Sequence, residues 1–379
     1  MSNAKIWLSS PHMGGGEQKF VQEAFDTNWV APLGPNVNNF ETDLENYLNQ
    51  NVFVGALSSG TAALHLGLIL LGVKAGDEVI CQSMTFSASA NPIAYLGASP
   101  VFIDSEMDTW NMCPIALEEA IIDRISNGKK PKAIIPVHLY GMPAKMDEIK
   151  KIASKYEIPI LEDSAEALGS SYKNQKCGTF GDIAVLSFNG NKIITTSGGG
   201  AMVTHTKELK DKAVFLSTQA RDNAPHYQHS EIGYNYRMSN ICAGIGRGQM
   251  EVLDTHVLKR RDMNAFYKEL FSTIKGVKVF SEPHSDFYSN HWLSAITIDE
   301  KLVGKSAEML RIALENENIE SRPLWKPMHL QPVFENCKYY GTKVAEHLFN
   351  SGLCLPSGSN LSENDKVRIK ESLLNFFNS

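Results

Sequence analysis

One lysine in this chain lies where a reactive amine would be useful. The stretch DIAVLSFNGNKIITTSGGG (residues 182–200) contains an apolar run, a short polar loop and then Lys192. This pattern predicts that Lys192 lies against a sheet, and burial of an amine disfavours its charged form. A neutral amine can attack a carbonyl and hold it as a Schiff base. The alternative is a surface lysine on a glycine-rich turn, because a motif this short is weak evidence alone.

Small polar residues in two segments are suited to binding an anion such as phosphate. Ser59, Gly60 and Thr61 follow the apolar run of residues 52–57 and precede a long apolar helix. The first N–H groups of a helix are unpaired and carry partial positive charge, so anions are stabilised there. Ser187 adds a hydroxyl near the lysine loop. An ordinary helix N-cap would explain the Ser/Thr residues equally well.

Two carboxylates and an aromatic ring suit a flat, charged ligand. Asp163 directly follows the apolar run of residues 158–162, and Glu166 lies one helical turn further on. In open α/β sheets, ligands bind beyond the carboxyl ends of the strands. Asp163 could therefore hold a protonated ring nitrogen, while Phe86 could stack on the ring. The alternative for Asp163 is an N-cap of the following helix.

One ligand satisfies all four features together. A phosphate cradle, a stacking aromatic residue, a carboxylate for a ring nitrogen and an imine-forming lysine match pyridoxal 5'-phosphate. The carboxylate keeps the ring nitrogen protonated. The ring can then withdraw electrons from the carbanion formed when a substrate proton leaves.

Alternating strand and helix patterns are expected to position these groups. Near-continuous apolar strands separated by helices predict a mainly parallel sheet covered on both faces. Strands are expected at 52–57, 78–83, 100–104, 133–138, 158–162, 183–188 and 201–204, and helices at 16–28, 40–48, from 61, 117–127, 147–156 and 207–216. The pattern changes near residue 250, which predicts a large domain (1–248) and a small C-terminal domain (249–379). The small domain is expected to contain helices at 252–270, 307–316 and 363–377, with strands at 277–280 and 293–298.

Composition narrows the class of protein. The 379 residues are 43% hydrophobic and 21% charged, and the net charge is -6 with no basic block, so nucleic acid is not an expected partner. No apolar run is long enough to span a membrane, and the first residues lack a secretory pattern. The six cysteines have no CxxC spacing, so neither a metal site nor a disulfide framework is expected. A reducing cytoplasm is the predicted location.

Four segments carry a family resemblance that covers nearly the whole chain. SSGTAALHL, EDSAEALGS, SFNGNKIITTSGGGA and GYNYRMSNICAGIG resemble signature segments of the DegT/DnrJ/StrS-type sugar aminotransferases, in the family's order. The resemblance implies the fold-type I aminotransferase α/β fold. That fold has a large domain with a mainly parallel seven-stranded sheet between helices, and a smaller C-terminal α+β domain.

The resemblance also implies roles for individual residues. Lys192 resembles the lysine that forms the Schiff base with the cofactor and shuttles the substrate proton. Asp163 resembles the partner of the pyridinium nitrogen, and Phe86 the ring-stacking aromatic residue. Glu166 departs from the glutamine that many members carry near the ring oxygen, which leaves open whether it must be protonated to donate.

The phosphate and subunit contacts follow in the same way. Ser187 and the turn at Gly60 resemble the phosphate cradle of the family. Asn235 resembles an asparagine that reaches the cofactor phosphate of a partner subunit, so the resemblance implies a homodimer with shared active sites.

The lysine also indicates the type of reaction. Relatives that remove the C-3 oxygen carry histidine at this position, so Lys192 favours transamination. The implied reaction has two halves: glutamate leaves its amino group on the cofactor, and a nucleotide-linked keto sugar then accepts that group.

The substrate is suggested by two shorter segments. FNGNKIITT and LWKPMHLQP resemble the branch that aminates C-4 of UDP-linked 4-keto-6-deoxy-N-acetylhexosamines in bacillosamine-like or legionaminic-type pathways for surface glycans. The alternatives are a GDP- or dTDP-sugar aminotransferase acting at C-3 or C-4, and a non-catalytic regulator of the same fold. The candidates for the sugar-nucleotide wall, for each of which a packing or surface role is an at least equal alternative, are Trp29, Arg237, Trp325, Lys326 and His329.

Overall fold

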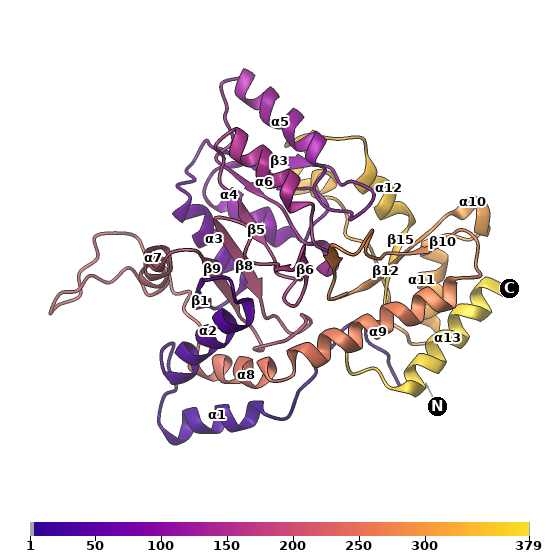
Figure 1. Cartoon of the computed structure of the whole chain (residues 1–379), viewed down its shortest axis with the longest axis horizontal. Helices are drawn as coiled ribbons and strands as arrows, with labels where there is room; N and C mark the ends of the chain where they lie inside the picture. The colour runs from indigo at the N-terminus through magenta and orange to yellow at the C-terminus, as the bar shows by residue number, and fades with distance from the viewer. Residues whose placement is uncertain (1–3, 379) are drawn as a thin grey trace.

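The structure is a computed structural model that describes residues 4–378, with a large α/β part and a smaller C-terminal part (Figure 1). The large part is built on one continuous sheet, because Ile134 bridges Ile160 and Val137 bridges Asp163 between its two halves. In sheet order the strands are β1 (Phe53–Leu57), β9 (Gly200–Thr204), β8 (Ile183–Ser187), β5 (Leu161–Asp163), β4 (Ala133–Ile135), β2 (Glu78–Gln82), β3 (Ser99–Ile103) and β14 (Lys338–Tyr340).

The predicted mainly parallel seven-stranded sheet is confirmed. Within residues 4–378, the seven strands from β1 to β3 in this order are mutually parallel except for β9, which is antiparallel to both of its neighbours. The eighth strand, β14, comes from the C-terminal part and pairs in parallel with β3. Because β14 has only three residues and none is buried, it leaves no hydrophobic pattern in the sequence.

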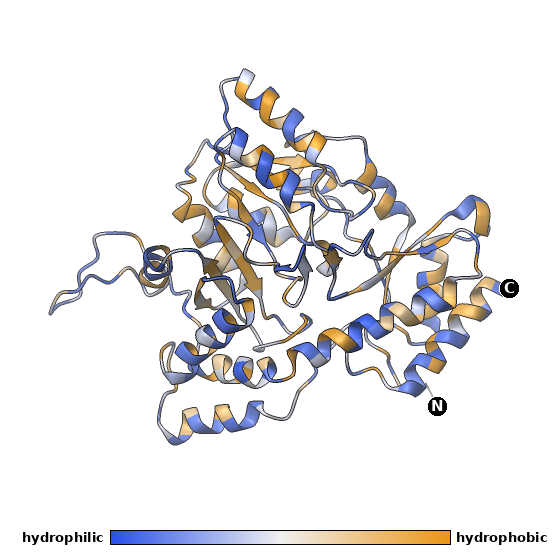
Figure 2. Cartoon of the chain, viewed as in Figure 1, coloured by the Kyte–Doolittle hydropathy of each residue, from blue (hydrophilic) through white to orange (hydrophobic). Residues whose placement is uncertain are grey.

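Helices cover both faces of this sheet. One face carries α3 (Gly60–Leu70), α4 (Asn91–Tyr95) and α7 (Lys207–Ser217), and the other carries α5 (Pro114–Ser126), α6 (Met146–Lys155), α2 (Pro35–Leu48) and α8 (Asn240–Met250). Side chains alternate along each strand between the two faces of the sheet. Ile183 and Val185 therefore pack on the face covered by α3, α4 and α7, whereas Ala184 and Leu186 pack on the face covered by α2 and α8. Figure 2 shows hydrophobic strands in the middle of the large part, flanked by helices that carry both hydrophilic and hydrophobic residues.

The start of α2 differs from the sequence prediction. The helix was expected from Phe40 onward, with the preceding Pro-Gly segment as a loop, but it begins at Pro35. Proline suits the first helical position, because its φ is preset and its missing N–H would have no partner there. The first helix, α1 (Glu17–Asp26), lies within its predicted range.

The C-terminal part packs around its own sheet and the long helix α9 (Leu253–Phe271). The sheet is antiparallel, in the order β10 (Val277–Val279), β12 (Ser294–Ile298), β15 (Gly352–Leu355) and β13 (Arg322–Pro323). Its other long helices are α11 (Ala307–Asn316), α12 (Val344–Ser351) and α13 (Glu363–Asn378). Residue 6 also belongs to this core, since Ile6 is buried there and bridges Ile319. The predicted boundary at 248/249 falls in the last turn of α8, just before α9 begins.

Residues 4–378 contain no helix long and apolar enough to cross a membrane. The same residues contain no group of three or more side chains arranged to hold a metal ion. All six cysteines are free thiols.

Candidate active site

A cavity of about 520 Å³ lies at the carboxyl ends of the parallel strands, where the large part meets the C-terminal part. This is the position at which open α/β sheets bind ligands. Eight of the nine predicted cofactor residues line it: Ser59, Gly60, Thr61, Phe86, Asp163, Glu166, Ser187 and Lys192.

Lys192 lies in the loop between β8 and β9 with its amine inside the cavity. Its side chain is only 10% exposed, and Nζ donates a hydrogen bond to Glu166 Oε1 at 3.2 Å. Nζ also lies 4.1 Å from the centre of the Trp292 ring. The amine is therefore held between a carboxylate and an aromatic face, away from bulk water.

Glu166 is a buried acid that faces this amine. Its second oxygen accepts the backbone N–H of Tyr140 at 2.8 Å. Burial raises the pKa of Glu166 to about 7, although the attraction of Lys192 and the Tyr140 N–H act in the opposite direction. Near neutral pH, this carboxyl group can therefore either accept or donate a proton.

Asp163 forms the floor of the cavity at the end of β5. Oδ2 accepts the hydroxyl of Ser89 at 2.6 Å, and Oδ1 accepts the backbone N–H of Ala165 at 3.1 Å. Burial raises the pKa of Asp163, and the Ser89 and Ala165 hydrogen bonds offset only part of that rise. An ionised carboxylate at this position would be stabilised by a cation in the cavity.

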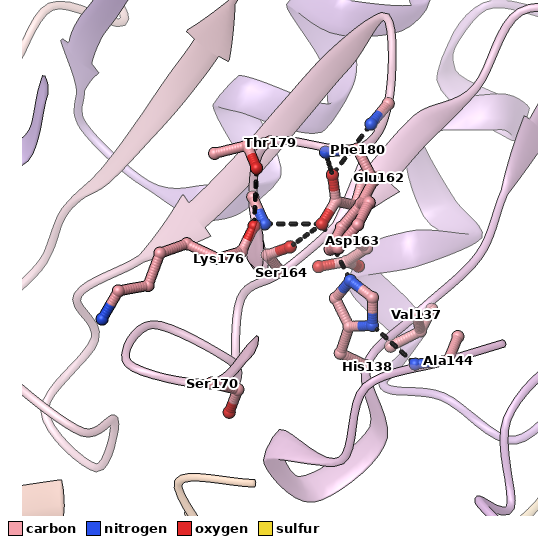
Figure 3. A network of polar contacts seen from close by, with 12 residues as sticks. Val137, His138, Ala144, Glu162, Asp163, Ser164, Ser170, Lys176, Thr179 and Phe180 are labelled. Atoms are coloured by element: carbon pink, nitrogen blue, oxygen red, sulfur yellow. Dashed lines mark hydrogen bonds and ion pairs between the residues drawn. The ribbon is translucent and has the colours of Figure 1, made fainter. Parts of the chain in front are cut away.

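A second buried network supports Asp163 from behind (Figure 3). Glu162 precedes it on β5 and points to the opposite face of the sheet, because side chains alternate along a strand. Its carboxylate accepts hydrogen bonds from the N–H groups of Gly178, Phe180 and Gly181 and lies 2.8 Å from His138 Nε2. Since His138 Nδ1 accepts the N–H of residue 144, the ring proton lies on Nε2 and points at Glu162.

The anion cradle is formed by the turn into α3. Ser59 is the N-cap and accepts the N–H of Ala62, which leaves the first N–H groups of the helix, at Gly60 and Thr61, without intrahelical partners. A Cβ atom at Gly60 would lie 3.1 Å from Ser187 Cβ, so the two residues are adjacent. A Cβ atom at Gly200 would lie only 2.4 Å from the Gly60 nitrogen, so only glycine fits there.

Aromatic side chains form the mouth of the cavity. Phe86 is 56% exposed, and its ring centre lies 5.6 Å from that of Trp325. Trp325 is the one predicted sugar-wall residue that lines the cavity. A flat ligand bound above Asp163 would therefore meet aromatic surfaces from both parts of the chain.

Two predicted site residues from the segment between α7 and α8 lie outside the cavity. Arg237 forms a buried ion pair with Glu41 and donates to the carbonyl of Ala56 at 2.8 Å, so it ties α2 to β1. Asn235 is exposed and bridges Thr218. Within this chain, neither side chain reaches the pocket.

Three further predicted sugar-wall residues also lie outside the lining. Trp29 is 40% exposed at the end of α1, and Lys326 is exposed. His329 instead packs inward, with Nδ1 2.6 Å from Ser83 Oγ and its ring stacked on Tyr339 at 3.8 Å. His329 thereby joins the segment LWKPMHLQP to the end of β2.

Sequence reasoning missed several residues of this site. Ser89, Trp292 and Arg322 all line the cavity, and Arg322 is two-thirds exposed and paired with Glu320 at 2.7 Å. Arg322 lies just before the segment LWKPMHLQP that the sequence did single out, so a signal near it existed. Ser89 and Trp292 had none, because their roles depend on contacts across 74 and 101 residues of chain.

These residues fit pyridoxal phosphate. Within residues 4–378 the hydrogen bonds to the buried Asp163 come from neutral donors, Ser89 and Ala165, and a protonated ring nitrogen would add a charged one. The α3 turn offers unpaired N–H groups to a phosphate, and the Lys192 amine lies on the same cavity. Such a donor set suits an anionic, aromatic aldehyde.

Comparisons with known proteins agree with this site. The sequence matches the DegT/DnrJ/EryC1/StrS aminotransferase family over residues 11–374. It is 52% identical to EpsN of Bacillus subtilis (strain 168), provisionally named a pyridoxal phosphate-dependent aminotransferase, over 99% of this chain and 96% of that protein. It is 38% identical to GDP-perosamine synthase of Escherichia coli O157:H7, over 98% of each. The structure resembles Helicobacter pylori PseC, an aminotransferase of pseudoaminic acid biosynthesis, with a TM-score of 0.89 and 25% identity over 99% of this chain and 100% of that one.

Fold and site together define a pyridoxal phosphate-dependent aminotransferase of fold type I. The chain belongs to the DegT/DnrJ/EryC1/StrS aminotransferase family. Its substrates are therefore an amino donor and a nucleotide sugar.

Proposed function

We propose that this enzyme transfers the amino group of L-glutamate to C-4 of a UDP-linked 4-keto-6-deoxy-N-acetylhexosamine, giving a UDP-4-amino sugar for surface glycan synthesis. The observation that carries the chemistry is the convergence of Lys192, Glu166 and Asp163 on one cavity, with Lys192 Nζ 3.2 Å from Glu166 Oε1. Bound pyridoxal phosphate supplies an aldehyde and a ring that withdraws electrons.

The protein groups divide the work of moving protons. Lys192 acts as general base at the donor carbon in the first half-reaction and as general acid at the acceptor carbon in the second. Glu166 shares a proton with the amine across their hydrogen bond, while Asp163 keeps a proton on the ring nitrogen. The side chains around them exclude water, which keeps these charges effective.

Both substrates carry negative charge, and the cavity wall offers one cation besides the lysine. Among the described residues that line it, Lys192 and Arg322 are the only lysine or arginine side chains. We expect Arg322 to exchange its ion pair with Glu320 for a carboxylate or diphosphate of a substrate. Trp325 and Phe86 then flank the sugar.

The UDP sugar and the C-4 position are supported by the segments FNGNKIITT and LWKPMHLQP. A GDP-linked 4-keto sugar is the second candidate, favoured by the 38% identity with GDP-perosamine synthase. The test incubates the enzyme with glutamate and defined UDP-, GDP- or dTDP-linked keto sugars, followed by NMR of the product. The proposal predicts a C-4 amine on the UDP sugar; turnover of the GDP sugar alone would favour the second candidate, and a C-3 amine would contradict both.

We further propose a homodimer whose active sites are shared. The middle of the segment between α7 and α8 extends away from the body of the molecule, whereas both ends of the segment pack against it (Figure 1). Tyr227 and Ile232 on it are 79% and 85% exposed, which is unusual for apolar side chains unless a partner covers them. Asn235 lies at its base, where it would reach a neighbouring subunit. Because all six thiols are free, we place the reaction in the reducing cytoplasm.

A further inference from the structure

The carbonyl next to the reactive lysine is held by two residues that are distant in sequence. Lys192 lies in the loop between β8 and β9, and its own N–H makes only a local turn to Asn189. The Asn191 carbonyl, in contrast, accepts the Ser9 hydroxyl at 2.9 Å and the Trp292 indole N–H at 2.6 Å. The position of the lysine backbone therefore depends on these two donors.

Both donors are bound by a single buried arginine on α9. Arg260 is 1% exposed, donates through Nη1 to the Trp292 carbonyl at 2.6 Å and through Nη2 to Ser9 Oγ at 3.0 Å. It also donates to the carbonyl of Ser357 at 3.2 Å. No carboxylate of residues 4–378 forms an ion pair with it, although buried arginines are seldom left without one.

This arrangement gives each donor a direction. Because the guanidinium occupies a lone pair of Ser9 Oγ, the hydroxyl proton is free to point at Asn191. Because the same guanidinium binds the Trp292 carbonyl, it fixes the residue whose ring faces the Lys192 amine. The planar fork of arginine can serve both acceptors together, which a lysine ammonium cannot match in geometry.

We propose that Arg260 is a positioning residue for Lys192. It does not touch the amine, but it orients Ser9 and Trp292, which hold the backbone carbonyl of Asn191, the residue before Lys192. The inference rests on the proposed function only in taking Lys192 as the reactive residue.

The test compares Arg260→Gln with Arg261→Gln in the full-length protein freed of cofactor. Arg261, the next residue on α9, binds Glu282 and the Ser289 carbonyl and touches neither Ser9 nor Trp292. An amine-acetylating reagent is applied, and peptide mass spectrometry measures modification of Lys192 against Lys145, whose side chain is 22% exposed in another region. We expect the Lys192/Lys145 ratio to rise several-fold in Arg260→Gln and to stay at the wild-type value in Arg261→Gln.

A second comparison covers the case in which Arg260→Gln fails to fold. Ser9→Ala removes one donor to Asn191 without disturbing the core, and it should raise the same ratio. In the loaded enzyme, Arg260→Lys should lower kcat by between about tenfold and a hundredfold with little change in KM, since small misplacements of a reacting group act on the chemical step. When Ser9→Ala and Trp292→Phe are already present, adding Arg260→Lys should lower kcat little further.

Three outcomes would overturn the inference. They are an unchanged labelling ratio with kcat within twofold of wild type, equal increases at Lys192 and Lys145, and fully additive losses in the combined variant. Failure of the proposed function gives a different result, because wild-type enzyme would then show no amino transfer while the labelling ratio still reports on Arg260.

Discussion

Glu166 Oε1 lies 3.2 Å from Lys192 Nζ, and neither side chain is more than 10% exposed. The amine therefore donates its hydrogen bond to the acid in a part of the cavity that is largely shielded from bulk water. Because burial raises the pKa of Glu166 to about 7, both protonation states of the acid are accessible at neutral pH. This property depends on residue 166 being a carboxylic acid, because an amide at this position could not exchange a proton near neutral pH.

The first prediction concerns stability against pH. The pKa of Glu166 is about 7 in the folded protein against an ordinary 4.5, so between these values the folded state binds the extra proton and stability falls as pH rises. The free energy of unfolding of wild type relative to Glu166→Gln should therefore fall by about 3 kcal/mol between pH 4 and pH 8. Urea unfolding of cofactor-free protein measures this difference. Glu148→Gln on α6 is the exposed control, and a pH-independent difference for Glu166→Gln would show that the acid is not perturbed.

Asp163 should matter through its charge. Asp163→Asn keeps the shape but loses the charged hydrogen-bond partner of the ring nitrogen, so kcat should fall on the order of a hundredfold or more. Ser89→Ala, which removes the 2.6 Å hydrogen bond to Asp163, should give a smaller loss of about tenfold. Asp182→Asn is the control, because Asp182 binds the Ile160 N–H outside the cavity. Wild-type kcat for Asp163→Asn would be incompatible with the assigned role.

Shared active sites predict complementation between two chains that are each impaired in a different residue of the site. Lys192→Ala should retain cofactor through the α3 turn and Asp163 but fail to turn over, and Asn235→Ala should lose cofactor more readily. Mixing the two after reversible subunit dissociation creates heterodimers in which one site has both Lys192 and Asn235. Activity should then exceed the sum of the separate proteins. No gain in dimers that have demonstrably exchanged subunits would argue for independent sites.

The buried network around Glu162, behind Asp163, should contribute much more to the free energy of unfolding than an exposed ion pair does. Glu162→Ala leaves three backbone N–H groups and His138 without their acceptor, so it should cost about 3–5 kcal/mol in unfolding free energy. Glu118→Ala, which removes an exposed ion pair with Lys155, should leave the free energy of unfolding close to the wild-type value. Chemical denaturation measures the free energy of unfolding of both variants. Equal decreases for Glu162→Ala and Glu118→Ala would contradict the proposed importance of the Glu162 network.

Arg322 provides a test of substrate charge recognition. Arg322→Gln should raise KM for the anionic substrate that it binds by about tenfold while kcat changes little, because uniform binding is lost. Separate KM measurements for glutamate and for the nucleotide sugar identify which substrate that is. Arg311→Gln is the control, because Arg311 is paired with Glu308 and Glu315 and does not line the cavity. Unchanged KM values for both substrates would remove Arg322 from the site.

The sequence was most informative where function follows directly from chain order. Asp163 is the last residue of β5 and Lys192 lies in the loop that follows β8, and the carboxyl ends of parallel strands meet at one edge of a sheet. Ser89, Trp292 and Arg260 could not be foreseen, because their roles are created by contacts between distant segments. Arg237 is the opposite case. Its residue type and its neighbours in the sequence suggested ligand binding, but in the structure it forms a buried ion pair with Glu41. No local pattern in the sequence distinguishes an arginine that binds a ligand from one that forms a buried ion pair.

The most direct test of the account is the identity of the lysine that holds the cofactor. Borohydride reduction of the loaded enzyme, followed by proteolysis and mass spectrometry, locates the lysine that carries the pyridoxyl group. The account predicts this mass on the peptide containing Lys192 and on no other lysine at stoichiometric yield. Stoichiometric modification of a different lysine, with Lys192 unmodified, would contradict it.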